Sequence, residues 1–269
     1  MTRFFVELNV LIKQFIKQLI NQLKFIPKIY LLQFSRNNFQ RTFAKDGYII
    51  IKNYIDLETI RESLFLDSNG KLLSDEDPTD GTDVMSRASI ELEKALLSRI
   101  SDNSPSSRKI LGLIKSYLGS RCLTYSNGLL ILPERAINEG SWQPHHDSKF
   151  NKIKIYLWIS PYSKERHPLY FLKGSHKKFK FWNHGYGTRY PKIQKKEMLR
   201  IDGNTGDLIL FDTHGIHSSF KDKGLSRSAY TLNLDPIYNK SQTEYLLKGL
   251  NGRILNIESS KLSFDYLKK

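Results

Sequence analysis

The sequence contains Trp142-Gln143-Pro144-His145-His146-Asp147, a stretch that constrains both the local backbone and the chemistry of the chain. Side chains alternate between the two faces of a strand, so His145 and Asp147 point to one side if the backbone is extended. An imidazole and a carboxylate aimed at one spot supply two ligands of a 2-His-1-carboxylate site, which leaves open positions on Fe(II). The third ligand must then come from a distant segment.

The candidate for that third ligand is His217, which lies in the segment Phe211-Asp212-Thr213-His214-Gly215-Ile216-His217-Ser218-Ser219. Arg227 follows it by ten residues. A His-x-Asp pair by itself occurs in many unrelated chains. Combined with a distal histidine and a following arginine, it becomes a far more specific sign of an iron site. His146 lies between the two proposed ligands and is expected to face the opposite side, toward solvent or substrate.

The composition is that of a folded protein with a basic surface. The chain has 269 residues, of which 39% are hydrophobic and 12% aromatic, enough to bury a core. The single Cys122 excludes an intrachain disulfide and favours a reducing, cytoplasmic setting. The net charge of +15 suits nucleic acid, an anionic membrane or an acidic substrate. Because the basic residues are spread along the chain and no nucleic-acid module is recognisable, we expect no nucleic-acid partner.

The N-terminal segment 1–36 is predicted to be a separate unit, an amphipathic helix that Pro27 ends or kinks. Apolar residues recur there at spacings of three and four: Phe5, Leu8, Ile12, Phe15, Ile16, Leu19, Ile20 and Leu23. Six basic residues accompany one acid, Glu7. Residues 1–34 therefore either lie on an anionic membrane surface or pack on the domain core or a second subunit. No uninterrupted apolar run is long enough to span a bilayer.

Residues 37–118 are predicted to be mainly helical around one strand. Gly47–Ile51 is a β-branched run typical of a buried strand, and Asp56 can cap a helix that runs to Leu64. Helices are expected over Ile90–Ile100 and Ser107–Leu118, covering a sheet. Residues 67–85 are rich in Asp, Ser, Gly and Pro, which is typical of a loop.

From residue 121 onward the pattern changes to short strands separated by Gly and Pro, which indicates a sandwich or a jelly roll. The expected strands are Cys122–Tyr125, Gly128–Leu132, Ile153–Ile159, Leu169–Leu172, Asp207–Phe211, Ile216–Phe220 and Ala229–Asn233. Residues 177–200 are basic and aromatic and are interpreted as an irregular insertion beside the site. A helix is expected over 242–250, followed by a polar tail.

Four stretches, in this order, resemble the phytanoyl-CoA dioxygenase-like family of Fe(II)/2-oxoglutarate oxygenases across roughly residues 40–235. They are Phe43–Ile51; Trp142–Asp147; Lys154–Ile159 with Pro168–Lys177, which ends in a Gly-Ser-His turn; and Gly206–His217. The order is much more specific than any single stretch. The N-terminal 36 residues and the last 30 or so lie outside the resemblance.

The resemblance implies a fold that is α+β but mainly β. Its core is a double-stranded β-helix (a cupin-like jelly roll) flanked by helices and filling residues 37–269. It also implies that His145, Asp147 and His217 are the catalytic iron ligands, with 2-oxoglutarate and O2 as co-substrates. His214 is the alternative distal ligand, but the family's ligand follows Gly-x, as His217 does. Arg227 suits the remote carboxylate of 2-oxoglutarate, because a guanidinium offers two parallel donors. Ser219 and Asn127 are further candidates for contact with the co-substrate.

The sequence therefore predicts a dioxygenase that hydroxylates an unactivated C–H bond and releases succinate and CO2. The substrate is expected to be a small-molecule, lipid or sugar-linked compound, with the basic charge favouring an anionic one. The alternative is a non-catalytic jelly roll that acts as a peripheral membrane or complex-forming module. The oligomeric state is not defined by these patterns.

Overall fold

The computed structural model describes residues 28–64, 82–132, 143–147, 152–159, 168–178, 188–220, 227–237, 253–258 and 261–265, together with isolated positions between 9 and 23. Within these ranges we find no helix with the length and hydropathy of a membrane span. The predicted loop 67–85 and the predicted helix 242–250 fall largely or wholly outside the described residues, as do His167 and His184.

The described chain is mixed helix and antiparallel sheet, and mostly sheet, as predicted. Its helices are α2 (Asn38–Asp46), α3 (Leu57–Ser63), α4 (Thr82–Ser101) and α5 (Pro105–Leu118), with 3-10 turns at Ser175–Lys177 and Lys195–Glu197. Its strands are β1 (Tyr48–Ile51), β2 (Arg121–Leu132), β3 (His145–His146), β4 (Ile153–Trp158), β5 (Leu169–Phe171), β6 (Thr188–Arg189), β7 (Leu199–Ile201), β8 (Leu208–Asp212), β9 (His217–Ser218), β10 (Arg227–Pro236), β11 (Arg253–Glu258) and β12 (Lys261–Asp265).

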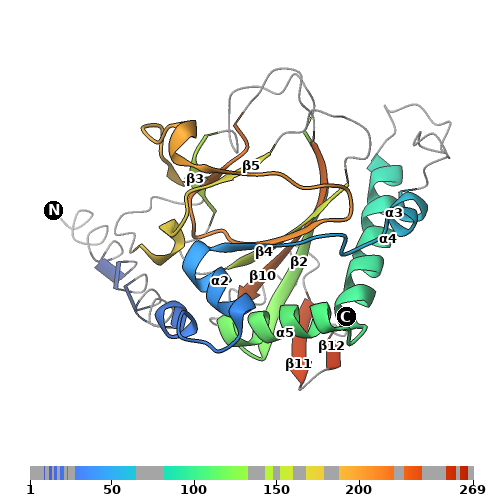
Figure 1. Ribbon diagram of the computed structural model, residues 1–269, viewed down its shortest axis with the longest axis horizontal. Coiled ribbons are helices and arrows are strands. Elements are labelled where there is room, and N and C mark those ends of the chain that lie inside the picture. The colour runs from blue at the N-terminus through green and yellow to red at the C-terminus, as the bar shows by residue number, and fades with distance from the viewer. Residues whose placement is uncertain are drawn as a thin grey trace.

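The strands form two antiparallel sheets that face each other. The larger has the order β1-β8-β4-β10-β2-β11-β12, and the smaller has the order β6-β3-β9-β5-β7. Helices α2 and α5 lie against the outer side of the larger sheet, and the smaller sheet lies on its inner side (Figure 1). The fold is therefore layered as helices, large sheet and small sheet, with the inner face enclosed between the sheets.

Strand β4 shows how the alternation of side chains builds these layers. Ile153, Ile155 and Leu157 belong to the main core with the helices, whereas Tyr156 and Trp158 belong to a second cluster between the sheets. Both faces of the strand are buried, so its sequence is nearly all apolar, as expected for a strand covered on both sides. Lys154 is the one charged residue of the strand, and it falls on the inner face.

The helices begin and end where local hydrogen bonding dictates. Asn37 caps α2, and Asp56 caps α3 by accepting the backbone N–H of Thr59, as predicted. Gly47 ends α2 in a left-handed conformation, with a φ of 88°, that suits glycine. Ser104 caps α5 and Pro105 takes its first position.

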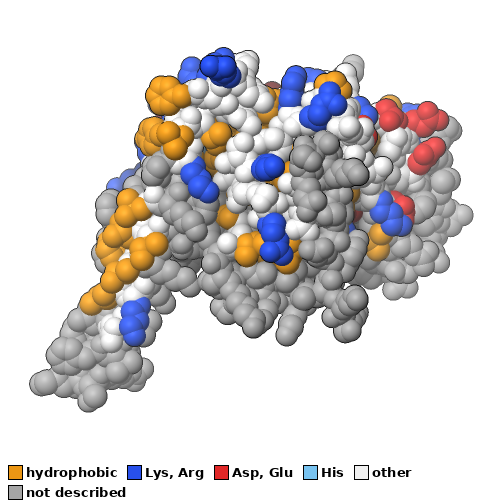
Figure 2. Space-filling view, turned by 90° about the horizontal axis from the view of Figure 1, so that it is seen from below, with side chains coloured by type: hydrophobic (Ala, Val, Ile, Leu, Met, Phe, Trp, Pro, Cys, Tyr) orange, Lys and Arg blue, Asp and Glu red, His pale blue; other side chains and the backbone are white. Residues whose placement is uncertain are grey.

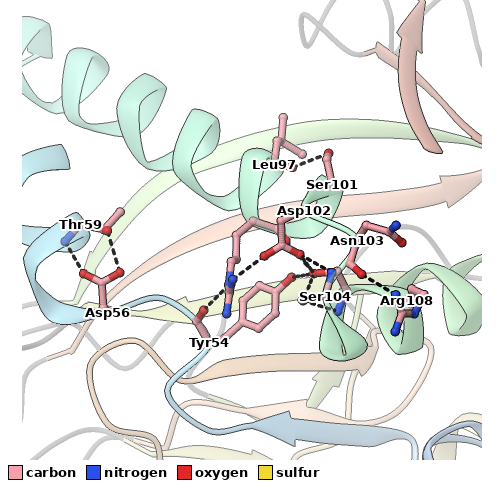
Figure 3. A network of polar contacts seen from close by, with 11 residues as sticks. Tyr54, Asp56, Thr59, Leu97, Ser101, Asp102, Asn103, Ser104 and Arg108 are labelled. Atoms are coloured by element: carbon pink, nitrogen blue, oxygen red, sulfur yellow. Dashed lines mark hydrogen bonds and ion pairs between the residues drawn. The ribbon is translucent and has the colours of Figure 1, made fainter. Parts of the chain in front are cut away.

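A polar network joins the helical layer to the turn after β1 (Figure 3). Arg99 of α4 donates to the carbonyl of Tyr54 at 3.1 Å and pairs with Asp102. Ser107 of α5 donates to the carbonyl of Arg99 at 2.7 Å and lies 3.2 Å from the Tyr54 hydroxyl. These bonds satisfy groups that would otherwise be buried without partners.

Several predicted elements differ in the structure. The two strands expected between Cys122 and Leu132 are one strand, β2, interrupted by a bulge at Asn127 where Gly128 has a φ of 73°. The interpretation of 177–200 as an irregular insertion was wrong in part, because β6 pairs with β3 and β7 pairs with β5. No strand was expected in the polar tail, yet β11 and β12 extend the larger sheet. Short strands of mixed polarity carry too little periodicity to be recognised.

In the N-terminal segment, the described positions from 9 to 23 and residues 28–32 have helical backbone. Ile29 is buried in the main core, and Leu32 packs against it. The predicted helix as a whole lies outside the described residues.

Gly206 tests how tightly the turn before β8 is constrained. Its φ is 86°, and a Cβ there would lie 2.1 Å from the carbonyl oxygen of Ile55. We expect Gly206→Ala to lower the free energy of unfolding by at least about 2 kcal/mol, since strained backbone and a clash combine. Gly112 of α5 has its nearest neighbour 3.7 Å away, so Gly112→Ala should be neutral or stabilise by up to about 1 kcal/mol. Urea unfolding of both variants measures the difference; equal stability of the two would contradict it.

Candidate metal centre

The structure brings His145, Asp147 and His217 together at the inner face of the smaller sheet. His145 and His217 are directly opposite each other on β3 and β9, and Asp147 follows β3. One ligand atom from each lies within 4.8 Å of the other two. The His145 Nε2 is 3.3 Å from Asp147 Oδ1, and the His217 Nε2 is 3.6 Å from Asp147 Oδ2. Metal–ligand bonds of about 2.1 Å at right angles separate two donors by about 3 Å, so these distances fit one shared ion.

Both imidazoles are held in the tautomer that a metal requires. His145 Nδ1 lies 2.7 Å from the carbonyl oxygen of Gln143, and His217 Nδ1 lies 3.0 Å from that of Gly215. A carbonyl oxygen only accepts, so each Nδ1 carries the proton and donates it. The Nε2 lone pairs are thereby left to face the Asp147 carboxylate. A hydrogen bond at the second ring nitrogen is the usual device that orients a ligating histidine.

The turn that delivers His217 is fixed from two directions. The buried Asp212 carboxylate accepts the backbone N–H of His214 at 2.9 Å and of Lys152 at 3.1 Å, and the Tyr117 hydroxyl of α5 donates to it. Ser175, in the Gly-Ser-His turn, accepts the backbone N–H of Ile216 at 2.7 Å. The family-like turn therefore braces the residue that immediately precedes the candidate ligand.

Asp147 is held by backbone and by charge. Its N–H donates to the carbonyl of Thr213 at 3.0 Å, and Lys154 Nζ lies 2.6 Å from its Oδ2. Burial raises the pKa of this carboxyl, but the charge of Lys154, followed by interactions with His217 and a hydrogen bond from His145, outweighs burial and holds the pKa well below its usual range. Burial, followed by repulsion from His145, lowers the pKa of His217. An ionised carboxylate and a neutral imidazole are the forms that bind metal.

The other histidines that the structure describes lie outside this cluster. His214 is fully buried, with its Nε2 3.4 Å from the carbonyl oxygen of Lys178. His146 faces away from the triad as predicted, but the expectation of contact with solvent was wrong: it is 1% exposed and bonds the Tyr190 hydroxyl at 2.9 Å. Tyr190 follows β6, whose pairing with β3 was not foreseen. His176 ties its turn to α2 through the carbonyl of Ala44.

For the three residues predicted to contact the co-substrate, the structure gives the backbone position but not every side chain. Arg227 begins β10, two residues before Ala229 of the cluster between the sheets, but its side chain is outside the described part. Asn127 is the extra residue of the β2 bulge, and its side chain is likewise not described. Ser219 is buried immediately after β9. Their roles stay predictions.

Two polar residues of the inner face were missed from the sequence, Lys154 and Asn233. They are paired neighbours on β4 and β10. Asn233 is 1% exposed, and neither of its amide atoms has a hydrogen-bond partner among the described residues. A buried amide without partners costs about 1–3 kcal/mol, which marks this position for contact with a ligand or water. The alternating sequence Ile-Lys-Ile-Tyr-Leu-Trp could have revealed the position of Lys154, because alternation puts Lys154 on the same face of the strand as Tyr156 and Trp158.

A cavity of about 490 Å³ lies elsewhere, between Asn53–Asp56 and the end of α4. None of the triad residues lines it. Its polar groups include those of the network that joins α4 to Tyr54, and they bond one another. The candidate functional site is therefore the triad, because its side chains, and not those of the cavity, form a set of metal donors.

Two imidazoles and one carboxylate, converging from neighbouring strands between two antiparallel sheets, have the composition of a mononuclear non-haem metal centre. The sequence model of the family "Phytanoyl-CoA dioxygenase (PhyH)" matches residues 43–228, well over half of the chain. The chain therefore belongs to this family of Fe(II)/2-oxoglutarate-dependent enzymes, and the resemblance predicted from its motifs is confirmed. The donor set fits the iron, and 2-oxoglutarate is the co-substrate of the family.

Similar solved structures are distant. The epimerase SnoN in complex with Fe3+, alpha ketoglutarate and nogalamycin RO is 15% identical, with 77% of this chain and 83% of that chain covered and a TM-score of 0.46. The apo form of ThoJ, a non-heme monooxygenase, is 14% identical, with 74% and 77% covered and a TM-score of 0.48. EvdO2 from Micromonospora carbonacea var. aurantiaca, complexed with 2-oxoglutarate, is 12% identical, with 79% and 96% covered and a TM-score of 0.47. These similarities are too low to support an argument, and no curated protein sequence matches the chain.

His217 and His214 form a matched pair for testing the centre, since both are buried and lie on one turn. We expect His217→Ala to weaken Fe(II) or Co(II) binding by more than about 100-fold, beyond the range of indirect effects, and His214→Ala to leave it within a few-fold. Anaerobic titration calorimetry gives both affinities. The reverse pattern would show that His214 is the ligand.

Proposed function

We propose that the chain is an Fe(II)- and 2-oxoglutarate-dependent dioxygenase that hydroxylates an unactivated C–H bond. In this proposal residues 37–269 form one oxygenase domain with a double-stranded β-helix core. The observation that carries the proposal is the convergence of the His145 and His217 Nε2 atoms on Asp147. Bound iron supplies oxidation coupled to decarboxylation of 2-oxoglutarate to succinate and CO2.

The residues of the chain hold and orient the reactants. His145, Asp147 and His217 bind the metal on one side, and the hydrogen bonds at Nδ1 prevent the two rings from turning away. Positioning of this kind is a main part of what a protein adds to a cofactor's chemistry. The enclosure between the sheets, where Tyr156 and Trp158 are buried in one cluster with Phe211, limits the access of water to the inner face.

We assign the remote carboxylate of 2-oxoglutarate to Arg227, with Ser219 and Asn127 as additional contacts. The support is the position of Arg227 at the start of β10 and the burial of Ser219 beside β9. The substrate is proposed to be a small-molecule, lipid or sugar-linked compound. The buried amide of Asn233 on the inner face offers it both a donor and an acceptor.

Succinate formation from 2-oxoglutarate, with Fe(II) and with or without candidate substrates, tests this function. Arg227→Lys keeps the charge but loses the two-pronged donor, so we expect its dissociation constant for 2-oxoglutarate to rise by about 10-fold or more while metal affinity stays unchanged. Binding is measured by titration calorimetry with the metal-loaded protein. A wild-type chain that binds neither iron nor 2-oxoglutarate would end the proposal.

The alternative, a non-catalytic jelly roll, makes the opposite forecast for the triad. A double variant, His145→Ala with Asp147→Ala, would then retain the biological function in cells. A protein that depends on the chemistry loses it. The convergence of three metal-ligating side chains favours the catalytic function.

A second proposal concerns residues 1–34, which we assign to an anionic membrane surface. Ile12, Ile16, Ile20 and Leu23 recur at helical spacing and are 47–59% exposed. Leu31 and Phe34, further along the segment, are 71% and 86% exposed. Figure 2 shows apolar side chains in a row along the segment at its lower left. The described part of the domain therefore leaves this apolar face open.

Charge selects an anionic lipid surface as the partner. The first 36 residues carry six Lys or Arg and only Glu7 as an acid. Each basic residue near an anionic bilayer contributes about 1 kcal/mol, and an apolar face buried among the acyl chains adds to this. A second copy of the same basic segment would meet repulsion instead, which disfavours self-association through this face.

Sedimentation with vesicles tests the membrane proposal. We expect binding to phosphatidylcholine–phosphatidylserine vesicles, weaker binding at high salt, and at least about a 10-fold loss when Ile12, Ile16, Ile20 and Leu23 are all replaced by Ser. A matched control replaces four comparably exposed residues elsewhere by Ser: Leu57, Ile90, Leu199 and Ile237. Equal binding by the two variants refutes the proposal. A wild-type dimer that only the first variant loses would identify a second copy as the partner.

A further inference from the structure

We propose that Lys154 is a positioning residue that holds Asp147 as a one-oxygen metal ligand and so keeps coordination sites open for the co-substrates. The inference rests on the proposed iron-dependent function and assigns a role within it to a residue outside the triad. It starts from the position of Lys154, the one charged side chain of β4, on the face of the sheet that looks toward the metal centre.

The two oxygens of Asp147 have different nearest partners, although Oδ2 also lies 3.6 Å from the Nε2 of His217. Lys154 Nζ lies 2.6 Å from Oδ2, which is the distance of a strong charge-assisted hydrogen bond. Oδ1 faces the Nε2 of His145 at 3.3 Å, the separation expected of two donors on one ion. The ammonium therefore occupies the oxygen that would otherwise be free to join Oδ1 on the metal.

The number of metal coordination positions that Asp147 occupies decides how many stay open for the co-substrates. A facial triad takes three corners of an octahedron and leaves the opposite three for ligands from solution. A carboxylate that binds through both oxygens takes a further corner, and the co-substrates then compete for what remains. A lysine on Oδ2 disfavours the two-oxygen mode, because an ammonium must be displaced before that oxygen can reach the metal.

Among the described residues, the Lys154 ammonium makes its ion pair with Asp147. Its neighbours across the sheet are Phe211 on β8 and Asn233 on β10. The Phe211 ring packs against the His217 ring, with centroids 5.2 Å apart. The Lys154 side chain is 15% exposed, so its charge is largely removed from water and directed at Asp147. A buried charge is stable only when it is paired, which makes this contact specific.

Metal binding by the purified full chain tests the inference without any need for a substrate. We expect Lys154→Met to change the coordination of bound Co(II), because it frees Oδ2 to join Oδ1 on the metal, and to leave Co(II) affinity equal or higher, because it removes a nearby positive charge. The visible absorption of bound Co(II) reports coordination number, and in this variant it should shift toward a higher-coordinate ion. Lys154→Arg keeps the charge at Oδ2 and should retain the wild-type spectrum, with affinity within a few-fold.

Lys152 provides the matched control. It lies two residues earlier, immediately before β4, is 3% exposed, and pairs with Asp235 at 3.3 Å rather than with Asp147. Lys152→Met should lower the melting temperature of the metal-free protein but leave Co(II) affinity and spectrum unchanged, so loss of a buried ammonium is separated from loss of the one at Asp147. If Lys154→Met does not fold, Lys154→Gln is used in its place, with the same expected result.

The outcomes distinguish a failure of the proposed function from a failure of the role of Lys154. Wild-type protein that binds no metal contradicts the proposed function itself. Wild-type protein that binds metal, together with a neutral Lys154 variant of unchanged Co(II) spectrum, overturns the role of Lys154 and leaves the function standing. A Co(II) spectrum of higher coordination number in the neutral variant, but not in Lys154→Arg or Lys152→Met, establishes it.

Discussion

The buried carboxylate of Asp212 is the contact on which both the layers and the site depend. It receives the Tyr117 hydroxyl from the helical layer, the Lys152 N–H from the start of β4 and the His214 N–H from the turn beyond β8. One side chain that has no contact with water thus holds three elements in position relative to one another. Because a buried carboxylate is costly unless fully bonded, the turn has little freedom to move. The carbonyls of Thr213 and Gly215 then hold Asp147 and His217 in place.

The larger sheet serves two purposes because its strands are covered on both faces. On β8, Leu208 and Leu210 pack with the helices, while Ile209 and Phe211 face the smaller sheet. The helical side is mainly apolar packing, with a few polar contacts such as that between the Tyr230 hydroxyl and Glu93, and it supplies stability. The inner side contains polar groups such as Lys154 and Asn233. Their desolvation costs free energy, which the apolar packing on the helical side must offset. The alternation of side chains thus separates the part of the sheet that stabilises the fold from the part that carries chemistry.

Sequence patterns predicted the long apolar strands, the capped helices and the convergence of His145, Asp147 and His217, since each rests on a period, a cap or an ordered set of motifs. They failed where pairing is decided by distant partners. Strand β6 has two residues and no periodicity of its own, yet its pairing buries His146 beneath Tyr190. The contact between Lys154 and Asp147 was missed for a related reason. The strand pattern gives the face on which Lys154 lies, but not how far a flexible side chain reaches.

The shortness of β3 and β9 follows from what the centre requires. If the ladder continued past His146, the Asp147 backbone would be committed to a neighbouring strand. Instead its N–H bonds the carbonyl of Thr213, in the turn that Asp212 orders. The carboxylate can then approach both histidines, whose opposed positions are set by the one remaining pair of the β3–β9 ladder. A long regular strand would place alternate side chains on one face but would space them along its axis. Ending the strand early lets a turn, anchored by a buried carboxylate, bring the third donor to the other two.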